Sequence, residues 1–276
     1  MGAYLRPRGL EEALQALTRP FTVLAGGTDF YPARVGRAVT EDILDIAGIA
    51  TLRGISETET GWRLGATTTW SELVEAPLPP LFDGLKQAAR EVGGRQIQNS
   101  GTIAGNICNA SPAADGVPAL LALDAEVELA SRDGTRRLPL ASFITGVRKT
   151  ARQPGELVVA LHVPRPKHAA RSAFLKLGAR RYLVISIAMA STLVEVEDGK
   201  VSAARVAVGA CSPVAQRLPL LEQALIGASF DATLGERVEP SHLAPLSPID
   251  DIRGSAAYRG DVSLVLLRRL LAKVSA

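Results

Sequence analysis

An α+β fold of two domains is predicted, and three features of the sequence predict it. Short runs of alternating apolar residues and runs with helical spacing follow one another up to about residue 166. Pro164 and Pro166 then close a strand, and the composition changes from Lys167 onward. The remaining part contains three strand-like runs and two helical ones. This pattern is typical of an antiparallel sheet backed by helices.

In the first part, helical spacing of apolar residues predicts a helix over residues 9–17, which Pro20 ends. Thr69 and Glu72 form a capping pattern that begins a short helix. The other elements are predicted from apolar runs and turn residues. In chain order they are a strand at 21–24, a helical turn at 31–35, a strand at 41–46, a hairpin of 55–59 and 62–65, helices over 81–92 and 116–123, a hairpin of 125–131 and 135–140, and a strand at 156–163.

The second part is predicted to contain strands and longer helices. Asp198 and Gly199 between two apolar runs are a hairpin signal. Strands are expected at residues 173–177, 184–197 and 201–209, and helices over residues 213–226 and 258–274.

Residues 99–115 fit neither periodic pattern, and we predict a close-packed loop there. Two glycines and two asparagines fall within residues 99–106, where they tolerate positive φ and let backbone amides approach a ligand closely. We expect that ligand to be a phosphate group. The neutral side chains of Thr102, Asn106 and Ser111 would add hydrogen bonds, and the carboxylate of Asp115 suits a sugar hydroxyl.

Another glycine loop directly follows the predicted strand at 21–24, and we call it the first glycine loop because it precedes residues 99–115, the second glycine stretch, in the chain. Paired glycines and a hydroxyl after a strand can assemble backbone N–H groups into a phosphate cradle. A Gly-Gly-Thr-Asp sequence also suits a plain turn, so either loop by itself is a weak signal. The first glycine loop consists of Ala25, Gly26, Gly27, Thr28, Asp29 and Phe30.

Taken together, the two loops resemble the FAD-binding subunits of the molybdenum hydroxylases, the xanthine dehydrogenase and carbon monoxide dehydrogenase group. The first family motif, Ala-Gly-Gly-Thr-Asp, is complete at residues 25–29. The second is Thr-Ile-Gly-Gly-Asn in the family and Thr-Ile-Ala-Gly-Asn at residues 102–106, so Ala104 is the one departure. Alanine would strain that position slightly if it needed positive φ. The resemblance extends to residues 4–7 and 111–115 and covers essentially the whole chain.

The resemblance implies a fold and a cofactor. Residues 1–166 would form a two-lobed FAD-binding domain of the p-cresol methylhydroxylase/vanillyl-alcohol oxidase type, with lobes of about 1–54 and 55–166. Residues 167–276 would form a C-terminal domain like that of the carbon monoxide dehydrogenase flavoprotein. FAD is expected to bind non-covalently, because no His, Cys or Tyr in the loops stands out as an attachment site.

Carried over position by position, the family's FAD contacts fall on both glycine stretches, on the end of the strand before the first glycine loop and on three further positions. Gly26, Gly27 and Thr28 are expected at the pyrophosphate. Lys176 would reach the flavin from the C-terminal domain, where a cation favours the anionic reduced form. The implied set is Val23, Leu24, Ala25, Gly26, Gly27, Thr28, Asp29, Phe30, Val92, Thr102, Gly105, Asn106, Asp115, Val158 and Lys176, with Val158 lining the ring pocket and Tyr182 or Val184 at the place of a family tyrosine.

Several of these residues also have simpler explanations. Asp115 could cap the helix predicted from residue 116, and Lys176 could be a solvated strand lysine. Trp62 and Trp70 are expected in the core rather than against the flavin. Neither a metal site nor a catalytic side chain is predicted, because no ligand spacing links the scattered His162, His168 and His242.

The family resemblance implies an electron-transfer subunit of an FAD-dependent oxidoreductase. Electrons would arrive from [2Fe-2S] clusters on a small partner subunit, after oxidation of the substrate at the molybdenum cofactor of a large subunit, and leave to NAD or another acceptor. Cys108 and Cys211 are too few to hold even one such cluster. We therefore expect an apolar partner interface near the cofactor. Ile97 and Ile103 could contribute to it, although packing in the core is the favoured explanation for either residue alone.

Two alternatives remain open. One is a self-contained FAD-dependent oxidoreductase of the vanillyl-alcohol oxidase type, although only about 110 residues follow the predicted FAD-binding domain. The other is an assembly or scaffold subunit that no longer binds flavin, against which the intact glycine loops argue.

Composition argues against several further classes. Lys plus Arg number 31 and Asp plus Glu 28, which gives a net charge of +3, and the basic pairs are scattered, so nucleic-acid binding is not expected. No run reaches the about 18 to 20 apolar residues of a membrane span. No signal peptide is visible at the N-terminus, and a cytoplasmic protein is expected.

Overall fold

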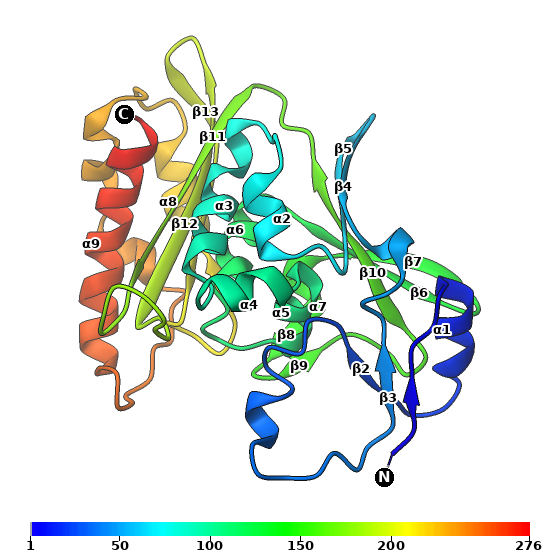
Figure 1. Cartoon of the computed structure of the whole chain (residues 1–276). Coiled ribbons are helices and arrows are strands. Elements are labelled where there is room, and N and C mark those ends of the chain that lie inside the picture. The colour runs from blue at the N-terminus through cyan, green and yellow to red at the C-terminus, as the bar shows by residue number, and fades with distance from the viewer. Residues whose placement is uncertain (1) are drawn as a thin grey trace.

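The computed structural model describes residues 2–276 and builds them around three main β-sheets, and its buried apolar residues form three clusters, the largest of which lies between the second and third sheets (Figure 1). The N-terminal segment, blue in Figure 1, lies at one end of the molecule, and the red C-terminal helix lies at the other. Of the helices within residues 2–276, none combines the length and the apolar character that crossing a bilayer requires.

The first sheet is parallel, and its middle strand is the third in the chain. Its elements are β1 (Tyr4–Leu5), α1 (Leu10–Ala16), β2 (Thr22–Leu24), η1 (Pro32–Arg34), β3 (Ile43–Asp45) and η2 (Ala50–Leu52), with the strand order β1-β3-β2. Ala13 of α1 and Leu44 of β3 are fully buried in the same cluster. The first glycine loop leaves the carboxyl end of β2, the edge at which open α/β sheets bind ligands.

The second sheet has five antiparallel strands in the order β4-β5-β10-β6-β7. Both predicted hairpins are present in it. Its segment of chain contains β4 (Ile55–Thr58), β5 (Gly61–Gly65), α2 (Trp70–Glu75), η3 (Pro80–Phe82), α3 (Asp83–Glu91), α4 (Arg95–Ser100), α5 (Ile103–Asn109), α6 (Gly116–Ala122), β6 (Glu126–Ser131), β7 (Gly134–Pro139), α7 (Leu140–Phe143), β8 (Ile144–Gly146), β9 (Lys149–Thr150) and β10 (Leu157–Pro164).

The helices of this segment share one large apolar cluster with the sheet. Trp70, Phe82 and Leu120 are among its fully buried side chains. Trp62 is buried as well and meets Phe82 edge to face at 5.3 Å between ring centroids. The expectation that both tryptophans belong to the core is therefore confirmed.

The prediction of a loop over residues 99–115 is wrong for most of residues 99–109, because α4 ends at Ser100 and α5 extends from Ile103 to Asn109. The Thr102 hydroxyl accepts a hydrogen bond from Gly105 N at 3.0 Å and caps α5. Ile103 and Ile107 stand one turn apart and are both fully buried. Burial of this apolar pair outweighs the low helix propensity of the glycine and asparagines of this helix. The non-helical residues of this stretch are limited to 101–102 and 110–115.

The third sheet is antiparallel, with the order β11-β12-β13-β14. Helix α9 buries Leu267, Leu270 and Leu271 in the cluster that it shares with this sheet. The elements are β11 (Ala169–Leu177), β12 (Ala188–Glu197), β13 (Lys200–Gly209), β14 (Gln216–Arg217), α8 (Pro219–Leu225), η4 (Ala232–Arg237), η5 (Pro240–Leu243) and α9 (Ala256–Val274).

Three predicted boundaries in this part are wrong. The strand expected from residue 173 begins at Ala169, four residues earlier. The helix expected from residue 213 begins only at Pro219, whose fixed φ suits the first turn, because residues 216–217 pair with β13 instead. The strand expected from residue 184 begins at Ala188, and the preceding residues form an outward loop.

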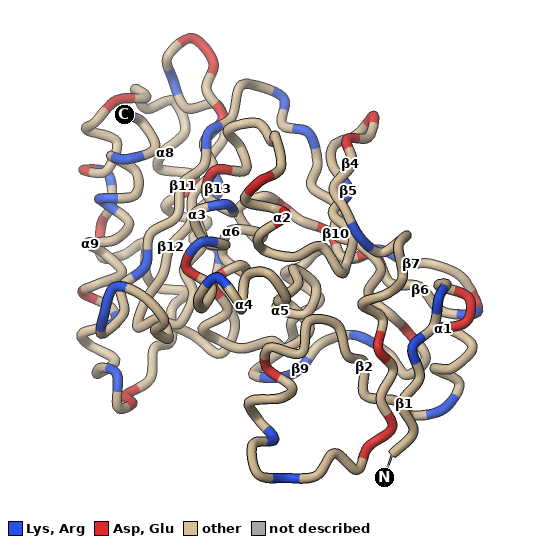
Figure 2. Tube along the Cα trace, in the orientation of Figure 1, with Lys and Arg blue, Asp and Glu red and all other residues tan. Residues whose placement is uncertain are grey.

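Polar contacts join the third sheet to the helices of the second. Ser172 of β11 accepts a hydrogen bond from Gly84 N at 2.8 Å and donates one to Leu81 O at 2.6 Å. Arg217 pairs with Asp124 at 2.6 Å. Figure 2 shows acidic and basic residues interspersed along the trace rather than gathered by sign. The predicted domain boundaries at residues 54 and 166 stay predictions.

Candidate cofactor site

The first glycine loop presents a row of backbone donors that the protein itself does not use. The N–H groups of residues 26–30 have no hydrogen-bond acceptor within residues 2–276, although the carbonyls of Gly27 and Asp29 accept bonds from Tyr31 N and Ala33 N. Unpaired donors carry a free-energy cost unless water or a ligand accepts from them. Consecutive N–H groups of this kind bind anions, phosphates in particular.

The two glycine stretches touch each other, as the phosphate-cradle hypothesis requires. A Cβ atom on Gly26 would overlap the carbonyl oxygen of Ser100 and lie 3.0 Å from Gly101 Cα. A Cβ atom on Gly101 would in turn lie 3.4 Å from Thr28 Oγ1. Glycine at both positions thus allows backbone-to-backbone contact between segments that are more than 70 residues apart in the chain.

Aromatic packing stiffens the first loop. Gly27 has φ of +70°, and a Cβ there would lie 2.7 Å from the Tyr31 ring. Phe30 meets Tyr31 edge to face at 5.2 Å, and the Arg34 guanidinium lies 3.7 Å from the centre of the Phe30 ring. These contacts, together with the ion pair of Arg34 with Glu41, fix the conformation of the loop before any ligand binds.

The second glycine stretch, residues 99–115, offers a ligand side-chain groups rather than unpaired backbone N–H groups. The first N–H groups of α5 are already paired, those of Ile103 and Ala104 with the carbonyls of Thr68 and Ala66. The amide oxygen of Asn106 is buried without a donor among the described residues and lies against Gly116. A hydroxyl of a ligand could satisfy that oxygen. Ala104 lies inside α5 and is not among the residues with positive φ, so replacing the family glycine causes no strain.

Asp115 and Lys176 form a buried ion pair between α6 and β11. The distance from Lys176 Nζ to Asp115 Oδ2 is 2.8 Å, and the Ser186 hydroxyl donates to Asp115 Oδ1 at 2.5 Å. Burial raises the pKa of Asp115, and the charge and hydrogen bond of Lys176 oppose that rise. Asp115 makes no capping bond to α6, and the lysine is not solvated. Both simpler explanations therefore fail.

The ammonium of Lys176 is fully engaged in this structure. Besides Asp115 it donates to Val184 O at 3.3 Å and to Glu91 O at 3.4 Å, which uses its three donors. It thus joins β11 to the end of α3 and to the loop at residues 178–187.

The remaining predicted residues occupy different surroundings. Val92 follows α3 and packs at the edge of the large cluster, whereas Val158 on β10 is buried inside it. The ring of Tyr182 is exposed, and Val184 packs back toward Gly178. Ser186 is a contact that sequence reasoning misses. It reaches Asp115 across 71 residues of chain, and no local signal announces such a contact.

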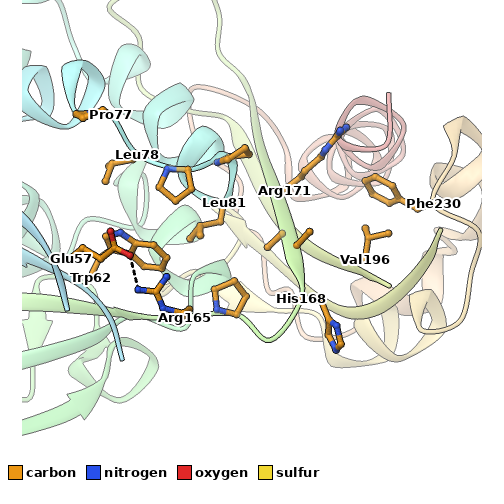
Figure 3. A pocket seen from close by; sticks show the side chains of 15 residues that line it. Glu57, Trp62, Pro77, Leu78, Leu81, Arg165, His168, Arg171, Val196 and Phe230 are labelled. Carbon is orange, nitrogen blue, oxygen red and sulfur yellow. Dashed lines mark hydrogen bonds and ion pairs between the residues drawn. The ribbon is translucent and has the colours of Figure 1, made fainter. Parts of the chain in front are cut away.

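A groove of about 970 Å³ lies elsewhere, between the β4-β5 hairpin, η3 and β11 (Figure 3). Arg165 crosses its wall, paired with Glu57 at 2.6 Å and lying 4.8 Å from the centre of the Trp62 ring. None of the residues predicted to bind the cofactor lines this groove. The volume of this groove therefore does not single out the predicted cofactor residues, whereas the unpaired N–H donors of residues 26–30 fall among them.

Comparison with known proteins agrees with this geometry. The family described as "FAD binding domain in molybdopterin dehydrogenase" matches residues 1–166. The family described as "CO dehydrogenase flavoprotein C-terminal domain" matches residues 173–274. The chain belongs to the FAD-binding subunits of the molybdenum hydroxylases.

Named relatives of this FAD-binding subunit match nearly its whole length. It is 30% identical to the xanthine dehydrogenase FAD-binding subunit of Escherichia coli O157:H7, over 99% of this chain and 96% of that one. It is also 30% identical to the carbon monoxide dehydrogenase medium chain of Afipia carboxidovorans, over 99% and 96%. A solved structure of carbon monoxide dehydrogenase from Oligotropha carboxidovorans superposes with a TM-score of 0.90 at 27% identity, covering 100% of this chain and 98% of that one.

The residues present fit FAD on their own chemistry. The pyrophosphate of a dinucleotide needs several N–H donors in a row, and residues 26–30 offer unpaired ones. Ribityl and ribose hydroxyls need acceptors, and the Asn106 amide oxygen is one without a donor among the described residues. The FAD-binding subunit therefore has suitable groups for both parts of the cofactor.

Proposed function

We propose that this FAD-binding subunit is the electron relay of a molybdenum-containing hydroxylase or dehydrogenase. It would accept electrons from the [2Fe-2S] clusters of a small partner subunit and pass them to NAD or another acceptor, while a large subunit with the molybdenum cofactor oxidises the substrate. The observation that supports this most is the row of unpaired N–H groups at residues 26–30, held against the second glycine stretch. We place this complex in the cytoplasm.

In the proposed arrangement, different parts of FAD contact different segments of the chain. The loop from Val23 to Phe30, with Gly26, Gly27 and Thr28 at its centre, would hold the pyrophosphate through backbone donors. Thr102 and Gly105 would keep α5 in position, so that Asn106 can receive a hydroxyl. Asp115 and Lys176 would set the junction between the FAD-binding and C-terminal domains, with Val92 and Val158 packing around the ring.

FAD, when bound, exchanges electrons singly with one partner and as a pair with another, which suits a junction between iron–sulfur clusters and NAD. The chain itself needs no acid, base or nucleophile for that role. Its two cysteines are Cys108, which is exposed, and Cys211, which is buried, and a [2Fe-2S] cluster takes four protein ligands. We therefore assign the clusters to a partner.

Acid precipitation of the purified chain tests how the cofactor is bound. We expect about one FAD per chain, all of it released into the supernatant and measured by its absorbance, since only hydrogen bonds and packing would hold it. Flavin that stays with the denatured pellet would contradict non-covalent binding. A purified chain that takes up no FAD even when FAD is added would favour the scaffold alternative.

A further inference from the structure

The groove between the β4-β5 hairpin, η3 and β11 is mainly apolar (Figure 3). Residues 77–81, a run of prolines and leucines, line one side of it, and Ala169 and Ala170 of β11 line another. None of the residues predicted to bind FAD is among them, so the groove is separate from the candidate cofactor site. Apolar surface that is gathered in one hollow of a soluble protein marks a place where something binds.

An arginine beside an aromatic ring stands at each end of the groove. The Arg165 guanidinium lies 4.8 Å from the centre of the Trp62 ring, and that of Arg171 lies 6.0 Å from the centre of the Phe230 ring. Figure 3 shows the two pairs at opposite ends. Arg165 pairs with Glu57, the single carboxylate of the lining, whereas Arg171 has no ion-pair partner within residues 2–276. The excess of positive charge favours an occupant with carboxylates.

The backbone of β11 borders the groove as a free strand edge. Strand β11 is the first of the four strands of its sheet and pairs only with β12. Phe174 N turns away from β12 and donates to Gln87 Oε1 of α3 at 3.0 Å. Because these directions alternate along a strand, Ala170 turns its N–H and C=O to the same edge. No hydrogen bond outside the β11-β12 ladder reaches either group. Free edge groups of this kind can pair with an added strand.

Hydrogen bonds fix the shape of the groove before anything binds. The Ser172 hydroxyl donates to Leu81 O at 2.6 Å and so joins β11 to η3. The carboxylate of the buried Glu195 accepts from Lys167 N at 3.0 Å and from His168 N at 3.2 Å, which holds the segment that leads into β11. The ordering cost of binding therefore falls mainly on the occupant.

The spacing of the charges favours an extended occupant. Arg165 and Arg171 are six positions apart in the chain, and six extended residues span at most about 20 Å. A peptide of about seven residues can thus place a carboxylate near each arginine, whereas a compact ligand with one acidic group would leave one end of the groove unused. A second copy of the chain related by twofold symmetry would bring like charges together, which disfavours self-association.

We propose that this groove binds an extended segment of another polypeptide, which pairs with the free edge of β11 near Ala170. Its apolar side chains would lie on the prolines and leucines of residues 77–81, and carboxylates at its two ends would pair with Arg165 and Arg171. The inference does not depend on the proposed electron relay, because the groove contains none of the residues proposed to hold FAD.

Selection of a phage-displayed random heptapeptide library on the full-length, FAD-loaded chain tests the inference. We expect the enriched peptides to carry apolar residues between acidic ends. The most enriched peptide is then synthesised with a fluorescent label, and its affinity is measured by anisotropy. Arg171→Glu reverses an exposed charge without an ion-pair partner among the described residues, so flavin content and melting temperature should stay unchanged while binding weakens about tenfold or more.

Arg269→Glu is the matched control for this variant. Arg269 lies on α9, is exposed, and likewise has no ion-pair partner within residues 2–276, but it does not line the groove. We expect less than about a twofold change in affinity for it. A general effect of net charge on peptide binding would instead weaken both variants equally, and that result would overturn the assignment of the groove.

Two N-methylated versions of the peptide separate strand pairing from side-chain contacts. Methyl groups on the odd-numbered amides block one edge of an extended peptide, and methyl groups on the even-numbered amides block the other. Since only one edge can face β11, we expect one version to lose at least about tenfold in affinity and the other to keep its affinity within about threefold.

Three further results would contradict the inference. Enrichment of peptides without acidic residues would reject the charge complementarity. Equal affinity of the two methylated versions would reject pairing with the edge of β11. A homodimer of the lone chain that excludes the peptide would assign the groove to a second copy instead.

Discussion

Gly27 has a backbone conformation and surroundings that a larger residue cannot share. Its φ is +70°, and any Cβ would meet the Tyr31 ring at 2.7 Å. We predict that Gly27→Val loses FAD while the fold survives, because the branched side chain costs about 1 to 2 kcal/mol in this conformation and displaces the loop. Flavin content per chain and the melting temperature measure the two effects separately.

Gly36 offers a matched control for this substitution. Its φ is +74°, but no atom would lie within 4 Å of an added Cβ. Gly36→Val should therefore cost similar backbone strain and keep its FAD. Full flavin occupancy in Gly27→Val would show that the first loop has been assigned wrongly.

Asp251 gives a pH-dependent contribution to stability. The N–H of Arg253 and the guanidinium groups of Arg259 and Arg253 lower its pKa to about 2, below the about 3.9 of a free aspartate. A lowered pKa stabilises the folded state above about pH 4, and this stabilisation is lost as the pH falls toward 2. Asp251→Asn should therefore melt below the unmodified protein at pH 6, with a gap that narrows from pH 4 downward. A gap that is independent of pH would contradict the ion pair.

At the residue scale, a loop suited to bind phosphate is easier to predict from the sequence than the partners that a buried side chain contacts. The glycine loop at residues 25–30 is predictable because a strand followed by paired glycines has a local signature. The partners of Asp115 are not, because Lys176 and Ser186 approach it from 61 and 71 residues away. Such contacts depend on tertiary packing, which no local spacing records.

Helix α5 is the element that links the second motif to the candidate cofactor site. Its N-cap, Thr102, accepts a bond from Gly105 N, and Asn106 lies in the first turns of the helix. We predict that Thr102→Ala costs about 1 kcal/mol of stability and weakens FAD binding several-fold, because the first turn frays and Asn106 moves. Thr102→Ser should restore both properties. Equilibrium titration with FAD and thermal unfolding provide the measurements.

Ser255, the N-cap of α9, provides the comparison for that prediction. Its hydroxyl accepts from Tyr258 N at 3.2 Å, so Ser255→Ala should cost similar stability without changing the affinity for FAD. If both cap variants lost FAD equally, general destabilisation would explain the loss, and α5 would have no special role.

At the element scale most helices and strands can be predicted from apolar spacing. The exceptions have physical causes. Residues 103–109 contain a glycine and two asparagines and look like a loop, yet burial of Ile103 and Ile107 makes them helical. Part of the outward loop at residues 178–187 has the sequence of a strand, since its valine and isoleucines suit a sheet. This loop stays outside the sheet because of its contacts with Lys176 and Arg259. Such contacts depend on tertiary packing and leave no local sequence signal.

The whole molecule depends on polar links between its sheets. Arg205 and Arg217 of the third sheet both pair with Asp124, and Arg205 also pairs with the buried Glu195 at 2.8 Å. Glu195 in turn accepts from Lys167 N, at the entrance to this part of the chain. The order of the domains can be predicted from the family motifs. The network that fixes their contact cannot, because it joins residues 81 and 93 positions apart.

The central claim is that this FAD-binding subunit relays electrons that originate on another subunit. The most direct test is the anaerobic visible absorbance of the flavin after addition of a purine, an aldehyde, an aromatic heterocycle or carbon monoxide, for the lone FAD-loaded chain and for the complex with both partner subunits. We predict that at least one of these substrates bleaches the flavin of the complex and that none bleaches the flavin of the lone chain. Rapid bleaching of the lone chain by any of them would contradict the relay and establish a self-contained flavoenzyme.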